Sequence, residues 1–168
     1  MKQDKSYLRS WAKQVRKGLN KNPALISRLK ETKEYMSAKR IMLFYPMKDE
    51  VDLLPLLEHK TKEFFLPKVD GEKLLCCPYR KGDELCLSCF NTQEPVSQPI
   101  NPQTIDLVIV PALVADKNNY RLGYGGGFYD RFLSGLKVTK IVCIPKELLI
   151  ETINPEKYDI PVDIVITD

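Results

Sequence analysis

The 168-residue sequence contains a single histidine, His59, and only five cysteines. One imidazole cannot build a metal centre of several histidines, and an odd number of unevenly clustered cysteines is not the framework of a secreted, disulfide-rich domain. No segment approaches the roughly 20 consecutive apolar residues that a membrane-spanning helix requires. The first residues are charged and no apolar segment of a secretory signal follows them. We therefore expect a cytoplasmic protein with reduced cysteines and no membrane partner.

Length and composition predict one domain over residues 1–168, because hydrophobic cores divide into separate domains only in much longer chains. The net charge of +4 is unevenly distributed, since residues 1–40 carry twelve Lys and Arg against three acidic residues. Such a basic segment is typical of a nucleic-acid arm, an anion-binding site or a solvated helix face. We expect no nucleic-acid partner, because aromatic residues do not alternate with the basic ones. The sequence pI of about 8.7 is also below the value of about 9 that is typical of nucleic-acid-binding domains.

Residues 1–40 are predicted to form a basic helical segment that packs on a sheet. One apolar stripe follows helical spacing through Leu8, Trp11, Ala12, Val15 and Leu19. About 100° away on the helical wheel lies a basic stripe, formed by Lys5, Arg9, Lys13 and Arg16. After a predicted cap at Asn22-Pro23, a second and less regular amphipathic helix is predicted from Leu25, Leu29, Thr32 and Met36.

After Arg40 the pattern changes to short apolar runs that are typical of buried strands. The predicted strands cover residues 41–45, 63–67, 73–77, 106–110, 140–144 and 162–167, with helices at 51–59 and 128–136. Prolines make residues 95–102 a predicted loop. Fully apolar strands that alternate with helices indicate a parallel sheet covered on both faces. The predicted fold is a single-domain α/β protein with a mainly parallel central sheet and helices on both faces, a three-layer Rossmann-like arrangement.

A glycine-rich segment, residues 121–131, carries the most information about function. Four of the eight glycines lie between positions 123 and 127, and such clusters mark sharp turns or close approach to a ligand. Main-chain N–H groups before a helix can bind an anion, and Arg121 can add a charged fork to phosphate oxygens. Asp130 could hold Mg²⁺. The spacing matches neither common phosphate-binding glycine motif, so a surface turn is the alternative.

The run R-L-G-Y-G-G-G-F-Y-D-R-F-L, preceded by D-L-V-I-V-P, resembles the signature of the 5-formyltetrahydrofolate cyclo-ligases, also called 5,10-methenyltetrahydrofolate synthetases. Shorter matches occur in order along nearly the whole chain. They are Lys5 with Leu8-Arg9 and Arg16, the segment M-K-D-E-V-D at 47–52, the segment L-P-K-V at 66–69, Glu94-Pro95, and Tyr158-Asp159 with Val162-Asp163 and Thr167. Phe128 departs from the pattern, because many members have tyrosine at that position.

The resemblance implies an ATP- and Mg²⁺-dependent ligase. It would convert 5-formyltetrahydrofolate to 5,10-methenyltetrahydrofolate through a phosphorylated formyl group and release ADP and phosphate. It assigns ATP binding to Lys5, Arg9, Arg16, Arg121, Leu122, Gly123, Tyr124, Gly125, Gly126, Gly127, Phe128 and Tyr129. It assigns folate binding to Tyr45, Glu50, Tyr124, Gly125, Gly126, Gly127 and Phe128, and Mg²⁺ binding to Asp130 and Asp163. We expect a monomer; a non-catalytic nucleotide- or folate-binding module is the alternative.

Two further features are not assigned a function. Cys86 and Cys89 form a single C-x-x-C, whereas a closed zinc site usually pairs two such units, so these cysteines are predicted to be small buried hydrophobic residues. His59 is predicted to lie at an exposed helix end.

Overall fold

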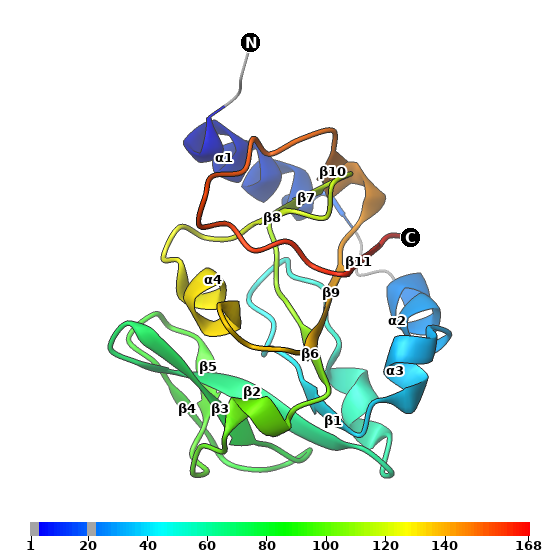
Figure 1. Cartoon of the computed structure of the whole chain (residues 1–168), viewed down its shortest axis with the longest axis vertical. Coiled ribbons are helices and arrows are strands. Elements are labelled where there is room, and N and C mark those ends of the chain that lie inside the picture. Colours follow the sequence, from blue (N-terminus) through cyan, green and yellow to red (C-terminus); the bar gives the residue numbers. More distant parts are fainter. Residues whose placement is uncertain (1–3, 20–22) are drawn as a thin grey trace.

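Six strands form the central sheet of the computed structural model, which describes residues 4–19 and 23–168. Their order is β11-β9-β6-β1-β2-β3 (Figure 1). The bounds are β1 (Arg40–Met42), β2 (Glu63–Asp70), β3 (Lys73–Pro78), β6 (Leu107–Ile109), β9 (Thr139–Cys143) and β11 (Ile164–Ile166). All neighbouring pairs are parallel except the β2–β3 hairpin. The predicted mainly parallel sheet is confirmed.

Two small sheets were not predicted. One has the order β10-β7-β8, and the other is the antiparallel pair β4-β5. Their bounds are β4 (Leu85–Leu87), β5 (Gln93–Pro95), β7 (Val114–Asp116), β8 (Arg121–Leu122) and β10 (Leu149–Ile150). Strands of two or three residues are too short to produce a periodic pattern. The predicted loop at 95–102 is wrong at both ends, because Pro95 ends β5 and Pro102 begins a 3-10 helix, η2 (Pro102–Thr104).

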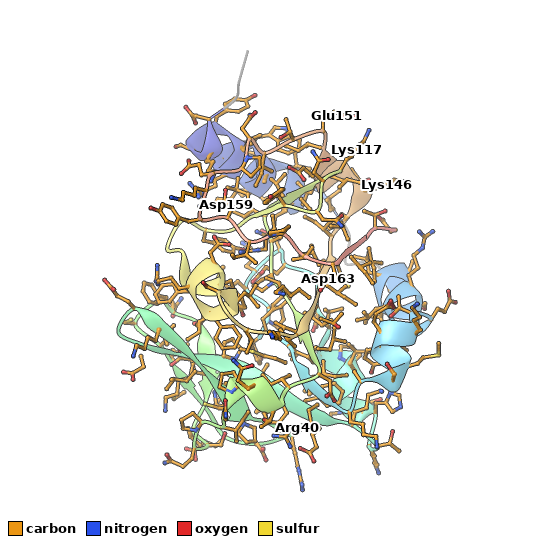
Figure 2. The ribbon with its side chains drawn as sticks, viewed as in Figure 1. Arg40, Lys117, Lys146, Glu151, Asp159 and Asp163 are labelled. Carbon is orange, nitrogen blue, oxygen red and sulfur yellow. The ribbon has the colours of Figure 1, made fainter. Side chains whose placement is uncertain are left out.

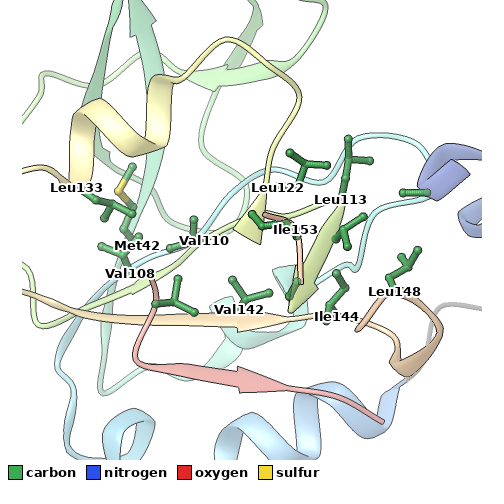
Figure 3. Packing of buried hydrophobic residues seen from close by; sticks show 14 of the residues in the cluster. Met42, Val108, Val110, Leu113, Leu122, Leu133, Val142, Ile144, Leu148 and Ile153 are labelled. Atoms are coloured by element: carbon green, nitrogen blue, oxygen red, sulfur yellow. The ribbon is translucent and has the colours of Figure 1, made fainter. Parts of the chain in front are cut away.

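The two faces of the central sheet are covered by different layers, because neighbouring residues of a strand point to opposite sides. Helices α2 (Pro23–Lys30) and α3 (Lys33–Ser37) and the 3-10 helix η1 (Leu54–Glu58) cover one face, in a core that includes Ile41 and Leu107. The other core includes Met42, Val108 and Val142 (Figure 3). Helices α1 (Lys5–Lys17) and α4 (Phe128–Leu133) and the sheet β10-β7-β8 cover it, and η3 (Lys146–Leu148) lies near α1. The three-layer arrangement is confirmed, with one outer layer made of helices and a small sheet.

The N-terminal helices differ partly from the prediction. In α1, Leu8 and Ala12 are buried, and Asp4 caps the helix by accepting a hydrogen bond from the Tyr7 main-chain nitrogen. The predicted second helix is two helices, because the side chain of Thr32 accepts a hydrogen bond from the Tyr35 nitrogen and starts α3. Tyr35 is therefore buried and Met36 exposed.

The remaining differences concern the ends of two elements and one predicted cap. Asn22, the predicted cap, lies outside the described residues, whereas α2 begins at Pro23 as expected. Helix α4 ends at Leu133, three residues earlier than the predicted end at Leu136. No described helix is long and apolar enough to cross a membrane.

Candidate active site

A cleft of about 830 Å³ lies where several separate parts of the chain meet. Its walls come from the first turns of α1, from the loops that follow β1 and β6, and from the glycine loop, which we define as residues 123–127. The hairpins β2–β3 and β4–β5 and residues 156–159 complete it. Ligands of open α/β sheets bind outside the carboxyl ends of parallel strands, and the loops after β1 and β6 lie at that edge.

The cleft brings together most of the residues that the sequence singled out. They are Lys5, Arg9, Tyr45, Glu50 and all residues from Arg121 to Asp130. Arg16 and Asp163 do not line it. The structure therefore joins residues more than a hundred positions apart, and it separates two of the predicted ones from the rest.

The glycine loop needs glycine for two different reasons. Gly125 has φ of 109°, a backbone conformation that residues with a Cβ rarely adopt. At Gly123, a Cβ would lie 2.3 Å from Nη2 of Arg121, which passes directly beside the backbone. The loop is thus shaped by a positive φ and by a close cation, as expected for a segment that approaches a ligand.

Two basic residues of α1 face this loop. Arg9 donates from Nε to the carbonyl oxygen of Gly123 at 2.9 Å. Lys5 donates from Nζ to Oδ2 of Asp159 at 2.7 Å and lies 3.6 Å from the carboxylate of Glu156. These contacts fix both cations at the cleft wall and join α1 to the middle and to the end of the chain.

Arg121 is a buried cation beneath the loop. It donates from Nε to the Pro111 carbonyl at 2.8 Å, and its guanidinium stacks 5.5 Å from the ring centre of Tyr129. Nη1 lies 3.8 Å from Oδ1 of Asp130, in the first turn of α4. Burial lowers the pKa of Arg121 and the Asp130 carboxylate raises it. The carboxylate therefore helps to keep this buried cation charged.

Asp159, which the resemblance matched without a role, lies at the cleft, whereas Asp163 does not. Asp130 and Asp159 both line the cleft, and Oδ1 of Asp130 accepts a hydrogen bond from the Ile160 nitrogen at 3.2 Å. Asp163 lies at the amino ends of β9 and β11, where its Oδ2 accepts a hydrogen bond from the Lys140 nitrogen at 2.8 Å. Figure 2 shows Asp159 and Asp163 well apart. The position of Asp163 does not support the metal assignment, because strand direction places this residue at the edge of the sheet opposite the cleft.

At the other end of the cleft, Glu50 is a buried carboxylate with 6% of its surface exposed. Its Oε1 accepts a hydrogen bond from the Met47 nitrogen at 2.8 Å, and the Tyr124 hydroxyl lies beside the same side chain. Burial raises the pKa of Glu50, while the Met47 N–H, Arg16 and Tyr124 lower it. Burial also raises the pKa of Tyr124 to about 12, so this hydroxyl keeps its proton at neutral pH.

Arg16 contacts this group rather than the cleft itself. Its Nη1 donates to the hydroxyl of Tyr124 at 2.7 Å, and its Nε donates to the main-chain oxygen of Asp49 at 3.1 Å. The expectation that Arg16 contacts ATP is therefore not supported by its position.

The wall between the two ends is apolar and aromatic. Phe44, Tyr45, Val69, Leu74 and Phe90 line it together with Phe128. The rings of Phe90 and Phe128 meet edge to face with centres 5.6 Å apart. Phe90 and its neighbours on the β4–β5 hairpin were missed, because no pattern in the sequence indicates that this exposed hairpin reaches the glycine loop.

Comparison with known proteins identifies the family. The profile described as the 5-formyltetrahydrofolate cyclo-ligase family matches residues 2–168. The chain belongs to this family. The 5-formyltetrahydrofolate cyclo-ligase of Escherichia coli K12 is 30% identical over 142 residues, which cover 77% of this chain and 78% of the relative. The mouse protein of the same name is 26% identical over 152 residues, which cover 79% and 75%.

Solved structures of cyclo-ligase relatives share the fold. The NMR structure of Aquifex aeolicus 5,10-methenyltetrahydrofolate synthetase matches with a TM-score of 0.86 at 34% identity and covers 97% of this chain and 89% of its own. The Mycoplasma pneumoniae synthetase, 23% identical, has the same fold with a TM-score of 0.78 over 98% of both chains. The resemblance that the glycine-rich run suggested is confirmed.

Three residues outside the cyclo-ligase pattern, Cys86, Cys89 and His59, do not line the cleft. Cys86 and Cys89 are exposed, so the prediction that they are buried is wrong, because the β4–β5 hairpin leaves the core after Leu85. His59 is exposed beside the end of η1, as predicted, and its Nδ1 lies 3.2 Å from the hydroxyl of Tyr35.

Proposed function

We propose that this protein converts 5-formyltetrahydrofolate to 5,10-methenyltetrahydrofolate with consumption of ATP. One observation carries the proposal: a single cleft joins a cationic, glycine-rich end to an aromatic end that contains a buried carboxylate. The first end suits a triphosphate and the second suits a planar, polar ring. The family membership names the reaction that requires both ligands in one site.

At the glycine-rich end, three cations are available to the phosphates of ATP. Lys5, Arg9 and Arg121 line the cleft around the glycine loop, whose main-chain N–H groups can add uncharged donors. Helix α4 has only six residues, so its dipole contributes little and the cations and loop amides bind the phosphates in this proposal.

At the aromatic end, Glu50 and Tyr45 would receive the pterin ring of the folate. A pterin carries N–H donors along one edge, and a charged carboxylate accepts two such bonds in one plane. Phe90 and Phe128 offer apolar ring surfaces on the way to the glycine loop. Where the family often has a tyrosine hydroxyl at position 128, this chain would contribute only ring contact.

In the proposed reaction, the formyl oxygen attacks the γ-phosphorus of ATP, and ADP leaves with the electron pair of the broken P–O bond. The amine nitrogen at position 10 then attacks the activated formyl carbon, and inorganic phosphate leaves as the five-membered ring closes. The protein contributes chiefly by holding the two reactants together and by stabilising phosphate charge with fixed cations. No nucleophilic serine, cysteine or histidine is required.

The residues at the phosphate end fit a magnesium ion bound together with ATP. Mg²⁺ prefers one or two carboxylates, with phosphate oxygens and water in the other positions, and Asp130 and Asp159 supply two. Within residues 4–19 and 23–168, no group of three or more His, Cys, Asp or Glu could hold a metal alone. ATP would therefore supply part of the ligand set, and bound Mg²⁺ would neutralise phosphate charge.

The decisive experiment follows the near-ultraviolet absorbance of the methenyl product with 5-formyltetrahydrofolate, ATP and Mg²⁺. We expect product only when all three are present, with one ADP formed per product. Tight binding of ATP or formylfolate without any product would instead support the binding-module alternative. We propose that the protein acts as a monomer, as expected from the sequence, with all residues of the proposed site from one chain.

A further inference from the structure

One member of the basic stripe of α1 differs from the others in burial. Arg16 is 7% exposed, whereas Lys13 on the same stripe and Lys17 next to it are exposed. A buried guanidinium needs hydrogen-bond acceptors around it, because an unpartnered charge is costly away from water. The acceptors that Arg16 uses therefore indicate its role.

These acceptors belong to two different loops of the cleft. Nε of Arg16 donates to the main-chain oxygen of Asp49, which precedes Glu50, and Nη1 donates to the hydroxyl of Tyr124 in the glycine loop. Asp49 has φ of 67°, a left-handed conformation that aspartate adopts more readily than most residues with a side chain. The bond from Arg16 holds this turn directly beside Glu50.

The direction of the second path is fixed by chemistry. A guanidinium only donates and an ionised carboxylate only accepts, so the Tyr124 hydroxyl accepts from Arg16, and its own proton is left as the donor available to the neighbouring Glu50 carboxylate. A charged donor on the hydroxyl oxygen strengthens the bond that the hydroxyl makes in turn. Arg16 thus reaches Glu50 both through the backbone of Asp49 and through the hydroxyl of Tyr124.

We propose that Arg16 is a positioning residue that sets the orientation of the Glu50 carboxylate for the folate, through Asp49 and Tyr124, and does not bind ATP. The inference rests on the proposed function, because Glu50 lies at the end of the cleft assigned to the pterin. The proposal gives Arg16 a different role from Arg9, which contacts the glycine loop from the same helix and lines the cleft.

The test compares Arg16→Met, Tyr124→Phe, the double variant and a control, Lys17→Ala, which removes a positive charge at the exposed neighbouring position. KM for formylfolate and KM for ATP are measured separately, and formylfolate affinity is measured by calorimetry without ATP. Loss of a hydrogen bond to a charged group usually changes binding about ten-fold or more. We expect a rise of this size in KM and Kd for formylfolate with Arg16→Met, a KM for ATP within about two-fold, and wild-type values for Lys17→Ala.

The double variant identifies the path. If Arg16 acts partly through the hydroxyl, Arg16→Met must have a smaller effect in the Tyr124→Phe background than in wild type. Tyr124→Phe keeps the ring and tests the path even if Arg16→Met is poorly folded. A selective rise in KM for ATP, or loss of stability with unchanged formylfolate affinity in the folded fraction, would overturn the inference. If the wild-type protein binds formylfolate but forms no product, only the proposed function is overturned. The ratio of each variant's Kd for formylfolate to the wild-type Kd still tests the role of Arg16.

Discussion

Replacing Asp159 with asparagine tests which late aspartate serves the phosphate end of the cleft. Asp159 lines the cleft and accepts hydrogen bonds at Oδ2 from Lys5 at 2.7 Å and from the Glu156 nitrogen at 2.8 Å. Asp163 accepts a hydrogen bond from the Lys140 nitrogen at the opposite edge of the sheet. We expect Asp159→Asn to lower turnover strongly and Asp163→Asn to leave it nearly unchanged.

The expected sizes follow from these contacts. Side-chain exposure of the Lys5–Asp159 pair is 21% and 14%, and losing a pair that retains this contact with water costs about 1 kcal/mol in stability. If the activation barrier rose by the same free energy, turnover would fall about five-fold. A carboxylate that holds the metal against the phosphates belongs to a preorganised site, where removal of one contributor costs about 100-fold or more. Asparagine at 163 can still accept from Lys140, so that change costs less than about 1 kcal/mol.

The assay measures turnover at saturating formylfolate while Mg²⁺ and ATP are varied, with thermal unfolding as a check on the fold. Asp159→Asn should need more Mg²⁺ to reach half of its maximal rate. The reasoning is refuted if Asp159→Asn loses less than about five-fold with an unchanged Mg²⁺ requirement. It is also refuted if Asp163→Asn, in folded form, is the more damaged variant.

Three further predictions concern other residues of the cleft. Gly125→Ala should weaken binding of a non-hydrolysable ATP analogue in calorimetry. Gly82→Ala, also at positive φ but remote from the cleft, should lower stability only. If Gly125→Ala binds the analogue as tightly as wild type, the glycine loop is only a turn. Arg9→Ala should raise KM for ATP several-fold and exposed Lys13→Ala should not, so equal effects would indicate a diffuse field that salt screens. Because burial raises the pKa of Glu50 above 4.5, folding stability should fall as pH rises from 4.5 through the raised value. Glu50→Gln should remove that decline in urea unfolding measured against pH, and a decline that persists would contradict the assignment.

The fold was predictable where the sequence pattern matched a complete element. The apolar run at β6 has no competing interpretation. The strands predicted at 63–67 and 73–77 form the β2–β3 hairpin, whose turn contains Gly71 with φ of 62°. The break at Thr32 was not predictable from periodicity, since threonine fits both an amphipathic helix and an N-cap. Only the hydrogen bond to the Tyr35 nitrogen distinguishes the two.

The site was predictable as a set of residue types and less so as a geometry. The glycine-rich run located the centre of the cleft, and the basic stripe located the helix that faces it. Helical spacing alone makes Arg9 and Arg16 equivalent, and only the packing of Tyr124 and Asp49 shows that Arg16 turns away from the cleft. Asp159 and Asp163 are four residues apart, and both precede β11. The direction of β11 places Asp163 at the opposite edge of the sheet, whereas Asp159 pairs with Lys5 at the cleft wall.

The charge balance of the cleft explains why the same site would need both its cations and a metal. Among the described residues that line it, three are cations: Lys5, Arg9 and Arg121. Five are carboxylates: Glu50, Glu94, Asp130, Glu156 and Asp159. Of these carboxylates, Asp130, Glu156 and Asp159 lie with the cations at the glycine-rich end. A triphosphate entering alone would therefore find the three cations offset by three carboxylates, an arrangement that weakens binding. In our proposal, a divalent cation held by Asp130 and Asp159 would turn two of these carboxylates from repelling groups into ligands and would leave Lys5 available to the phosphates. The arrangement would therefore favour binding of the metal–ATP complex over binding of free ATP.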